Sequence, residues 1–421
     1  MTSVECIQKK NCRICNSSSL EKVVQLTPSP PGNNFLRKEQ IKDLTEEEFP
    51  LELHFCNSCY HIQLGHVVDP SFIFQNGYSY VSSTSKVFVN HLKEYSNHIE
   101  KMLQLKRSSF VVDIGSNDGT CLKFFRNKGM RVLGVDPATD IAAIATSKGI
   151  ETIDDFFSLN LAKQISNNYG KADLITSHNA CAHIDDLRGV IQGVESLLKN
   201  DGIFVMEVGY FVDVYTNSWF DTIYHEHVDF HTVAPLEKLF DLSNMELIRV
   251  ERISPQGGSI RVFVQKKDGL HPKHKSVDGL IKLEKSLGLN LPQTLKDFEI
   301  EINRLKEKFL NLILNIKREG KSIAAFGAPT KATTLCYHFG IEKKDIDFIV
   351  DDNPLKQGLF SPGKHIPVYA AKRIYDEKPD YLLILAWNFA ESIMKNHKKY
   401  LEEGGLFILP MPEPLIVGAK K

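Results

Sequence analysis

The sequence lacks long apolar runs and any imbalance of charge. No stretch reaches the roughly 18 consecutive apolar residues that a membrane-spanning helix needs. The N-terminus, MTSVECIQKKNCRIC, has no apolar signal core. With 51 basic and 52 acidic residues, the formal net charge is −1, which does not suit a protein that neutralises the phosphates of a nucleic acid polymer. We therefore expect a cytoplasmic protein with neither a membrane nor a nucleic acid polymer as partner.

Disulfides are also not expected in that compartment, so the eight cysteines should be metal ligands or buried thiols. Four of them form two pairs with one spacing, Cys12-x2-Cys15 and Cys56-x2-Cys59. Two such knuckles supply four thiolates, which close the tetrahedral shell of a structural zinc ion. The alternative is two unrelated buried pairs. Further donors occur nearby in the sequence: Cys6, His54 and His61.

From residue 110 onward, short apolar runs alternate with helical patterns. The runs FVVDIG, RVLGVD, DLITSHN and GIFVMEVG predict a doubly wound parallel sheet. After a turn-rich stretch, an amphipathic helix is expected over about 293–319, and a second alternation follows: SIAAFGA, IDFIVDD, YLLILAW and LFILP. We predict a small zinc-binding domain over 1–75, an α/β core over 76–268, and a helical linker with a Rossmann-like α/β domain over 269–421.

The stretch VVDIGSNDGT (111–120) has the pattern of a strand, a glycine turn and a helix start, and ligands bind outside the carboxyl ends of such strands. Gly115 and Gly119 would let the backbone approach a ligand. The motif is neither Gly-x-Gly-x-x-Gly nor a phosphate-binding GK[ST] loop. Asp113 would repel a phosphate and suits a cationic or amino ligand. Asp136, at the end of the second strand, is placed to accept hydrogen bonds from ribose hydroxyls.

This combination resembles the first two motifs of class I S-adenosylmethionine-dependent methyltransferases. The resemblance implies that the glycine loop and the second strand end hold the cofactor: Asp113, Gly115, Asn117, Gly119, Asp136 and Pro137. TIDDFFS (152–158) occurs where such enzymes contact adenine, so Asp154, Asp155 and Phe156 are candidates there. His178 and Asn179 follow the third strand and should face the cofactor cleft.

A longer series of motifs runs through the chain in a fixed order. Besides the cysteine knuckles and the glycine loop, it comprises GYSYVSSTS, HNACAHIDD, YHEHVDFHTVAPL, QGGSIRVF, GAPTKATTL and DDNPLKQGLFSPGKHIPV. Together these resemble the sugar C-methyltransferases that act on nucleotide-linked 4-keto-deoxyhexoses. The resemblance implies S-adenosylmethionine and a structural Zn²⁺ as cofactors, a nucleotide-linked 4-keto sugar as substrate, and methylation at C3, with C5 as the alternative. The oligomeric state stays open, with a monomer as one option.

The family's active-site residues map onto single positions of this chain. His227 in YHEH matches the base, Tyr224 and Glu226 match its companions, His183 matches a histidine beside the sugar, and Tyr78 matches a tyrosine that reaches the substrate. The remaining substrate contacts implied are Tyr80, Lys331, Asn353 and Lys356. At GAPTKATTL this chain has Thr330-Lys331-Ala332, where the family more often has alanine followed by lysine-glycine.

The chemistry explains why a histidine is needed. Carbon becomes a nucleophile only as an enolate, so a base must remove a proton next to the keto group. A neighbouring carboxylate such as Glu226 could orient the ring, and Tyr224 or His183 could stabilise the oxyanion.

Other interpretations of the same residues stay open. His225, His227 and His231 could form a metal site, although their spacing is not HExxH. The other functions considered are a small-molecule O- or N-methyltransferase, a zinc-ribbon RNA methyltransferase and a non-catalytic scaffold. The near-neutral charge argues against RNA, and the intact motifs argue against a scaffold.

Overall fold

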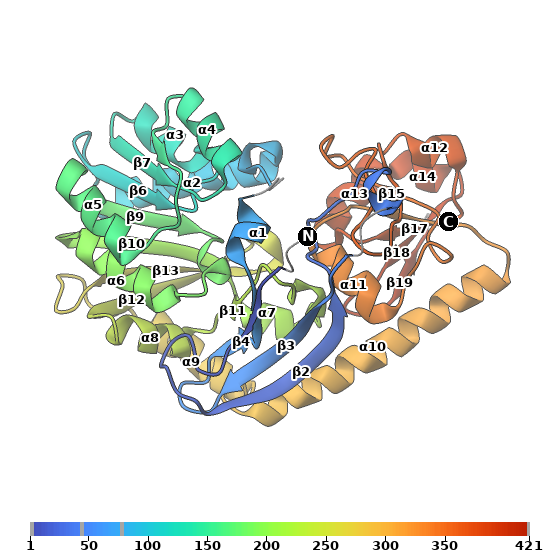
Figure 1. Ribbon diagram of the computed structural model, residues 1–421, viewed down its shortest axis with the longest axis horizontal. Helices are drawn as coiled ribbons and strands as arrows, with labels where there is room; N and C mark the ends of the chain where they lie inside the picture. Colours follow the sequence, from blue (N-terminus) through green and yellow to red (C-terminus); the bar gives the residue numbers. More distant parts are fainter. Residues whose placement is uncertain (1–3, 43–45, 76–79, 419–421) are drawn as a thin grey trace.

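The structure, a computed structural model, describes residues 4–42, 46–75 and 80–418. Two α/β lobes are joined by a small antiparallel sheet and one long helix (Figure 1). Within the described residues, no helix is both long and apolar enough to cross a membrane.

The first lobe is built on a seven-stranded sheet with the order β12-β13-β10-β9-β6-β7-β8. Numbered by their place in the chain and read from β8 to β12, these strands lie in the order 3-2-1-4-5-7-6, and only β13 runs opposite to the other six. The order reverses between β6 and β9, which opens a crevice at their carboxyl ends. The strands are β6 (Phe110–Ile114), β7 (Arg131–Val135), β8 (Thr152–Ile153), β9 (Ala172–His178), β10 (Leu198–Gly209), β12 (Met245–Ile253) and β13 (Ser259–Lys266). The four predicted strand runs are thereby confirmed.

Helices cover both faces of this sheet, because successive side chains of a strand point to opposite sides. Val111, Leu174 and Val205 pack against Phe88 and Tyr95 of α2, whereas the alternate residues face the other layer. The helices of this lobe are α2 (Lys86–Leu103), α3 (Thr120–Asn127), α4 (Thr139–Ser147), α5 (Leu159–Tyr169), α6 (Leu187–Leu197), α7 (Phe211–Thr216) and α8 (Val233–Asp241).

The N-terminal part forms a four-stranded sheet with the order β11-β4-β3-β2. Its strands are β2 (Leu20–Ser29), β3 (Phe49–Cys56), β4 (Ile62–Leu64) and β11 (Asp229–Phe230), and next to it lie β1 (Cys6–Gln8), β5 (His66–Val68) and α1 (Pro70–Phe74). β11 comes from the first lobe, directly after the YHEH motif. The N-terminal unit therefore shares a sheet with the segment predicted to carry the catalytic base.

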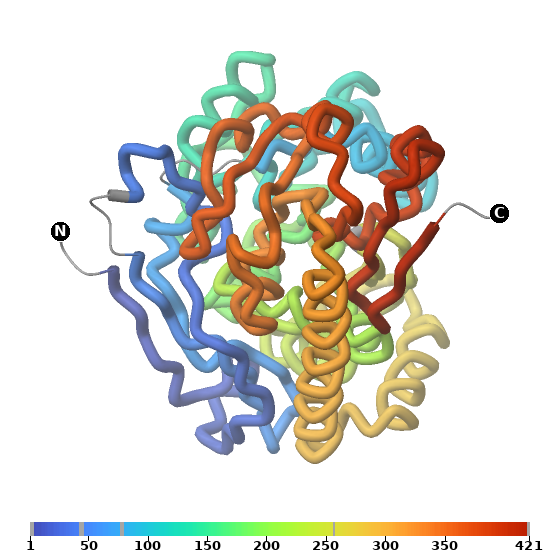
Figure 2. Tube along the Cα trace, turned by 90° about the vertical axis from the view of Figure 1, so that its right-hand side faces the viewer, coloured from blue at the N-terminus to red at the C-terminus, as the bar shows by residue number. Residues whose placement is uncertain are grey.

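The linker consists of α9 (Ser276–Ser286) and the 27-residue helix α10 (Pro292–Arg318), close to the helix predicted over 293–319. Figure 2 shows α10 on the face turned toward the viewer, next to the N-terminal strands and below the second lobe. One apolar stripe of α10 is buried, and its residues recur every three or four positions: Leu295, Phe298, Ile302, Leu305, Phe309, Ile313 and Ile316.

The second lobe has a six-stranded sheet with the order β16-β15-β14-β17-β18-β19, in which only β19 is antiparallel. Its elements are β14 (Ile323–Phe326), α11 (Lys331–Phe339), β15 (Ile349–Val350), β16 (Val368–Tyr369), α12 (Arg373–Glu377), β17 (Tyr381–Ile384), α13 (Ala390–Asn396), α14 (Lys398–Glu402), β18 (Leu406–Leu409) and β19 (Leu415–Val417). The N-terminal part reaches this lobe as well. Leu36 and Phe360 form an antiparallel bridge, and a Cβ on Gly32 would lie 2.2 Å from the Thr330 carbonyl oxygen.

Candidate active site

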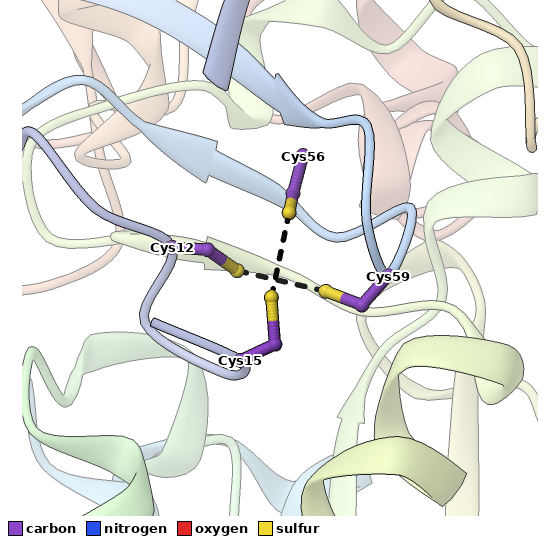
Figure 3. A group of neighbouring side chains, drawn as sticks. All are labelled: Cys12, Cys15, Cys56 and Cys59. Atoms are coloured by element: carbon purple, nitrogen blue, oxygen red, sulfur yellow. Dashed lines mark hydrogen bonds between the residues drawn. The ribbon is translucent and has the colours of Figure 1, made fainter. Parts of the chain in front are cut away.

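The four paired cysteines converge on one point (Figure 3). The Sγ atoms of Cys12 and Cys59 are 3.6 Å apart, as are those of Cys15 and Cys56, and all four lie within 4.8 Å of one another. A tetrahedral zinc ion with Zn–S bonds of about 2.3 Å would hold its sulfurs about 3.8 Å apart. The residues therefore fit a closed four-thiolate zinc site with no ligand position left for catalysis.

Both knuckles are built by the same local turn. The Asn16 amide donates to the Cys12 carbonyl and the Tyr60 amide donates to the Cys56 carbonyl, at 2.9 and 2.8 Å. Asn16 and Tyr60 both have a left-handed backbone, with φ of 59° and 66°. Asparagine tolerates this conformation readily and tyrosine does not. The left-handed residue of the second knuckle, Tyr60, could therefore not be predicted from the sequence.

The predicted cofactor loop follows β6 at the crevice of the first lobe. Gly115 and Gly119 have φ of 70° and 74°, and a Cβ on Gly115 would come within 2.4 Å of the Ala180 side chain. The amides of Asn117 and Ala138 donate to the two oxygens of Asp136, at 2.8 and 2.9 Å. Asp136 thus ties the loop after β6 to the loop after β7, and burial raises its pKa.

Asp113 has one buried carboxylate oxygen, Oδ1, with no hydrogen-bond partner in the described part of the chain. The ring of His178 lies nearby, with its Nδ1 3.8 Å from this oxygen. Burial raises the pKa of Asp113, and His178 lowers it. An unpaired buried carboxylate oxygen at a strand end fits the ammonium group of an amino-acid ligand, as the cofactor's methionine end would supply.

The other predicted cofactor residues lie around the same crevice. The Asp154 carboxylate is exposed and accepts a hydrogen bond from Thr139 Oγ1 at 3.2 Å. Phe156 and Pro137 are half-buried, whereas the next aromatic residue, Phe157, is buried in the core. Asn179 has φ of 59° and donates its amide to the Glu207 carbonyl at 2.8 Å.

Tyr224 and His227 form the central pair of the YHEH segment. A turn closed by the His227 amide and the Tyr224 carbonyl (2.9 Å) places their rings 4.1 Å apart. His227 Nδ1 donates to the Thr222 carbonyl at 2.9 Å, so this nitrogen carries the proton. Nε2 then accepts from the Tyr224 hydroxyl at 2.8 Å. Burial lowers the pKa of His227 to about 4, so its imidazole is neutral near pH 7.

His183 lies beside this pair, with its ring perpendicular to that of His227 and 5.0 Å away. It stands in the 3-10 turn Cys181–His183 after β9. Burial, and then the neighbouring His227, hold the pKa of His183 well below its usual value. His183, Tyr224 and His227 are each half-buried, so part of each residue is exposed.

Glu226 does not orient His227 in this structure, contrary to the prediction from the sequence. Both ring nitrogens of His227 are engaged by Thr222 and Tyr224, and Glu226 Oε1 has no hydrogen-bond partner among the described residues. The electrostatic partner of Glu226 is Lys356 of the second lobe. Burial raises the pKa of Glu226 to about 7, and Lys356 lowers it.

Two lysines predicted as substrate contacts lie on the second lobe. Lys331 Nζ donates to Asn388 at 3.0 Å and sits 3.3 Å above the Trp387 ring. Burial lowers the pKa of Lys331 to about 8, and Asp221 raises it. Lys356 Nζ is buried and donates to the Ala328 carbonyl at 2.8 Å.

Three further candidates have different placements. Asn353 closes its own turn, accepting from the Leu355 amide at 3.0 Å, so its side chain is structural here. Tyr80 is exposed, and its carbonyl accepts from Asn117 at 3.0 Å. Tyr78 lies outside the described residues.

The other two histidines of the cluster are buried. His225 Nε2 contacts the Phe49 carbonyl at 3.2 Å. The described residues contain no metal-binding group that includes His225, His227 or His231.

Asp221 was not anticipated from the sequence. It is fully buried, accepts a hydrogen bond from Trp387 Nε1 at 2.7 Å and faces Lys331, so it links the two lobes next to the YHEH segment. A single aspartate in an irregular stretch carries no pattern that would have marked it.

The fold and the site define an S-adenosylmethionine-dependent methyltransferase with a zinc-binding N-terminal domain. Three family descriptions match in sequence: "Putative zinc binding domain" over residues 12–74, "Methyltransferase domain" over 87–250 and "C-methyltransferase C-terminal domain" over 254–412. The chain is 34% identical over 409 residues to the C-methyltransferase NovU of Streptomyces niveus, which covers 97% of both chains. The chain belongs to this C-methyltransferase family.

More distant similarities are confined to part of the chain. The uncharacterized methyltransferase YcgJ of Bacillus subtilis is 27% identical over 110 residues, which is 25% of this chain and 43% of that protein. The solved structure of YcgJ superposes with a TM-score of 0.35 at 16% identity, covering 43% of this chain and all of YcgJ. The 1,6-didemethyltoxoflavin-N1-methyltransferase of Burkholderia thailandensis gives a TM-score of 0.32 at 18% identity, over 42% of this chain and 78% of that one.

Proposed function

We propose that this enzyme transfers a methyl group from S-adenosylmethionine to C3 of a nucleotide-linked 4-keto-deoxyhexose. The observation that carries the proposal is the Tyr224–His227 pair, in which a neutral imidazole has its Nδ1 proton fixed and its Nε2 lone pair turned toward a tyrosine hydroxyl. A C-methyltransferase needs a base for a carbon acid, and this pair supplies one.

The keto group at C4 makes the neighbouring C3–H acidic. His227 Nε2 takes that proton, and the resulting imidazolium keeps its Nδ1–H bond to the Thr222 carbonyl. The Tyr224 hydroxyl leaves Nε2 and turns to the oxygen at C4, where it stabilises the enolate charge. His183 stands perpendicular to His227 and bounds the same space.

S-adenosylmethionine, when bound, supplies a methyl group activated by a sulfonium centre. Asp113, with its unpaired buried oxygen, would hold the ammonium group, and Asp136 would hold the ribose hydroxyls. A Cβ on Gly115 would lie 2.4 Å from the Ala180 side chain, so the loop can follow this path only with a glycine.

Two lysines support a substrate that carries phosphate. Lys331 and Lys356 are cations of the second lobe, and each acts electrostatically on the YHEH segment, Lys331 on His227 and Lys356 on Glu226. Lys331 has one hydrogen-bonded neighbour in the described structure and can offer its other protons to a diphosphate. A sugar held by its nucleotide between the lobes would then present its keto group to Tyr224 and His227.

The test is a product analysis with a methyl-¹³C donor and a panel of dTDP-, GDP- and UDP-linked 4-keto-deoxyhexoses. The expected product carries the labelled methyl group on C3. Because C3 then bears no hydrogen, the methyl protons show no coupling to a ring proton, and the labelled carbon is bonded to a carbon atom. The 4-hydroxy sugar nucleotide is the matched control and should not react, because its C3–H is not acidic. Label on oxygen or nitrogen would overturn C-methylation of a keto sugar and favour the small-molecule O- or N-methyltransferase.

A further inference from the structure

We propose that Arg13 and His61, two side chains next to the zinc ligands, position the two segments that carry His183 and His227. The zinc knuckles would then hold the segments of both histidines in place. The inference rests on the proposed roles of His183 and His227. It adds Arg13, Asp185, His61 and Asp229 as positioning residues.

Arg13 braces the first segment. It follows Cys12 directly, and its side chain is only 1% exposed. Its Nε donates to Asp185 Oδ1 at 2.9 Å, and its Nη1 donates to the Leu64 carbonyl at 2.9 Å. Lys9 binds the other oxygen of Asp185 at 2.9 Å. Asp185 stands two residues after His183. The Arg13 guanidinium therefore links the His183 segment both to the first cysteine knuckle and to β4.

His61 braces the second segment. It lies two residues after Cys59, and its carbonyl accepts the amide of Cys56 at 2.9 Å. Its Nε2 is 2.7 Å from Asp229 Oδ1, and both side chains are fully buried. Asp229 stands two residues after His227 and begins β11, which pairs with β4.

The two braced segments are also bonded to each other. The Val228 amide donates to the Ala182 carbonyl at 2.8 Å, and the Leu64 amide donates to the Val228 carbonyl at 2.9 Å. Ala182 and Val228 are the immediate neighbours of His183 and His227. The spacing of the two imidazole rings is therefore set by a closed chain of contacts that starts and ends at the cysteine knuckles.

The cofactor loop has its own supports. Asn117 bonds Asp136, Ser82 and Tyr80, and none of these contacts involves Arg13 or His61. Loss of a brace should therefore disturb the base and leave cofactor binding intact. Because a displacement of about 1 Å in a catalytic group can cost about 100-fold in rate, a large effect on kcat is expected.

The experiment compares Asp185→Asn and Asp229→Asn with Ser17→Ala in the full-length, zinc-containing protein. Ser17 bonds Ser58 at 2.8 Å across the two knuckles, so it controls for a change near the zinc ligands. Asparagine keeps the shape of each carboxylate and removes its charge. Three quantities are measured: kcat, S-adenosylmethionine affinity by calorimetry, and the ¹⁵N signals of the His227 ring.

In both aspartate variants we expect kcat to fall by about 100-fold, S-adenosylmethionine affinity to stay within about twofold, and the ¹⁵N signals of the His227 ring to shift as its surroundings change. Ser17→Ala should resemble the wild type in all three. Unchanged His227 signals in folded Asp185→Asn and Asp229→Asn would overturn the proposal, as would a loss of cofactor affinity parallel to the loss of kcat.

If either variant fails to fold, Arg13→Lys gives the milder test, because it keeps the charge and loses the fork that binds Asp185 and Leu64 together. It should show a shift of the same ring signals with a smaller loss of kcat, and wild-type ring signals would contradict the positioning role of Arg13. The ring signals need no sugar substrate. A wrong assignment of the 4-keto sugar would remove turnover in every protein, yet leave the effect of the braces on His227 readable.

Discussion

His227 has a defined tautomer because each ring nitrogen has one partner of fixed type. The Thr222 carbonyl can only accept, so Nδ1 must donate. The Tyr224 hydroxyl meets the remaining lone pair on Nε2. The ring is therefore already in the tautomer whose Nε2 can take up a proton, so no change of tautomer has to precede proton removal.

Replacing His227 with Asn should lower kcat by about 10²- to 10⁴-fold, because general base catalysis is removed. S-adenosylmethionine affinity, measured by calorimetry, should not change, since none of the cofactor-loop contacts involves this ring. His225→Asn is the control from the same motif: its ring contacts the Phe49 carbonyl, so it should cost stability and keep most of kcat. Retained turnover in His227→Asn would remove this residue as the base.

Replacing Tyr224 with Phe should raise the pKa of His227 above its value of about 4. The hydroxyl donates to the neutral imidazole, and a bond to the neutral form disfavours protonation. Its loss therefore makes the ring easier to protonate. The acid limb of kcat/KM against pH should move to higher pH, with kcat reduced because the enolate loses a donor. An acid limb at its wild-type position would contradict the hydrogen bond drawn here.

At this scale the sequence predicted residue types better than side-chain directions. Tyr224, His227 and His183 meet as expected, because the turn at Tyr224–His227 and the 3-10 turn at His183 are local. Glu226 was placed wrongly as the orienting group. Its electrostatic partner is Lys356 of the second lobe, which is far from Glu226 in the sequence.

Asn117 links the segment 80–84 to the cofactor loop. Its side chain accepts from the Ser82 amide at 2.8 Å and donates to the Tyr80 carbonyl at 3.0 Å, so it fastens the 3-10 turn Ser82–Thr84 to the cofactor loop. Asn117 holds this place with φ of 51°.

Asn117→Gly should remove both hydrogen bonds to segment 80–84 without straining the cofactor loop, because glycine accepts a positive φ. Hydrogen exchange at residues 80–84 should become faster. S-adenosylmethionine affinity should fall, since segment 80–84 would no longer be held against the cofactor loop. Asn244→Gly is matched, with φ of 56° on an exposed turn, and should change neither. Unaltered exchange at 80–84 in Asn117→Gly would show that the two hydrogen bonds do not hold this segment in place.

Elements with strong periodicity were predictable and the joints between them were not. The strand runs of both lobes and α10 follow from local pattern, since each buries a continuous apolar face. β11 has two residues and pairs with β4 far away in the chain. No local pattern marks so short a strand, and the sharing of a sheet between the N-terminal part and the first lobe therefore appears only in three dimensions.

At the scale of the molecule, the site is assembled from all three parts and holds several neutral histidines. Burial lowers the pKa of His225, His227 and His231 to about 4 each, and holds that of His183 well below its usual value. A histidine with a lowered folded pKa contributes stability that is present above its unfolded pKa of about 6.5 and is lost as the pH falls toward 4.

We therefore expect the melting temperature to fall steadily between about pH 6.5 and pH 4, since each pKa unit corresponds to about 1.4 kcal/mol. Glu226 acts in the opposite sense: its pKa is raised to about 7, so its contribution is lost as the pH rises through 7. Calorimetry across pH 4 to 8 measures the sum. His231→Gln should flatten the acid side, because a glutamine does not take up a proton. A melting temperature that stays constant from pH 6.5 to pH 4 would contradict neutral burial of these histidines.

The central claim is that His227 makes an enolate at C3 of a 4-keto sugar nucleotide. The most direct test follows the C3–H signal by NMR in deuterated water, with enzyme, 4-keto sugar nucleotide and S-adenosylhomocysteine, so that proton removal proceeds without methyl transfer. We predict that wild-type enzyme exchanges C3–H for deuterium and that His227→Asn does not. Methyl transfer by wild-type enzyme with no exchange at C3, or exchange that persists in His227→Asn, would contradict the account.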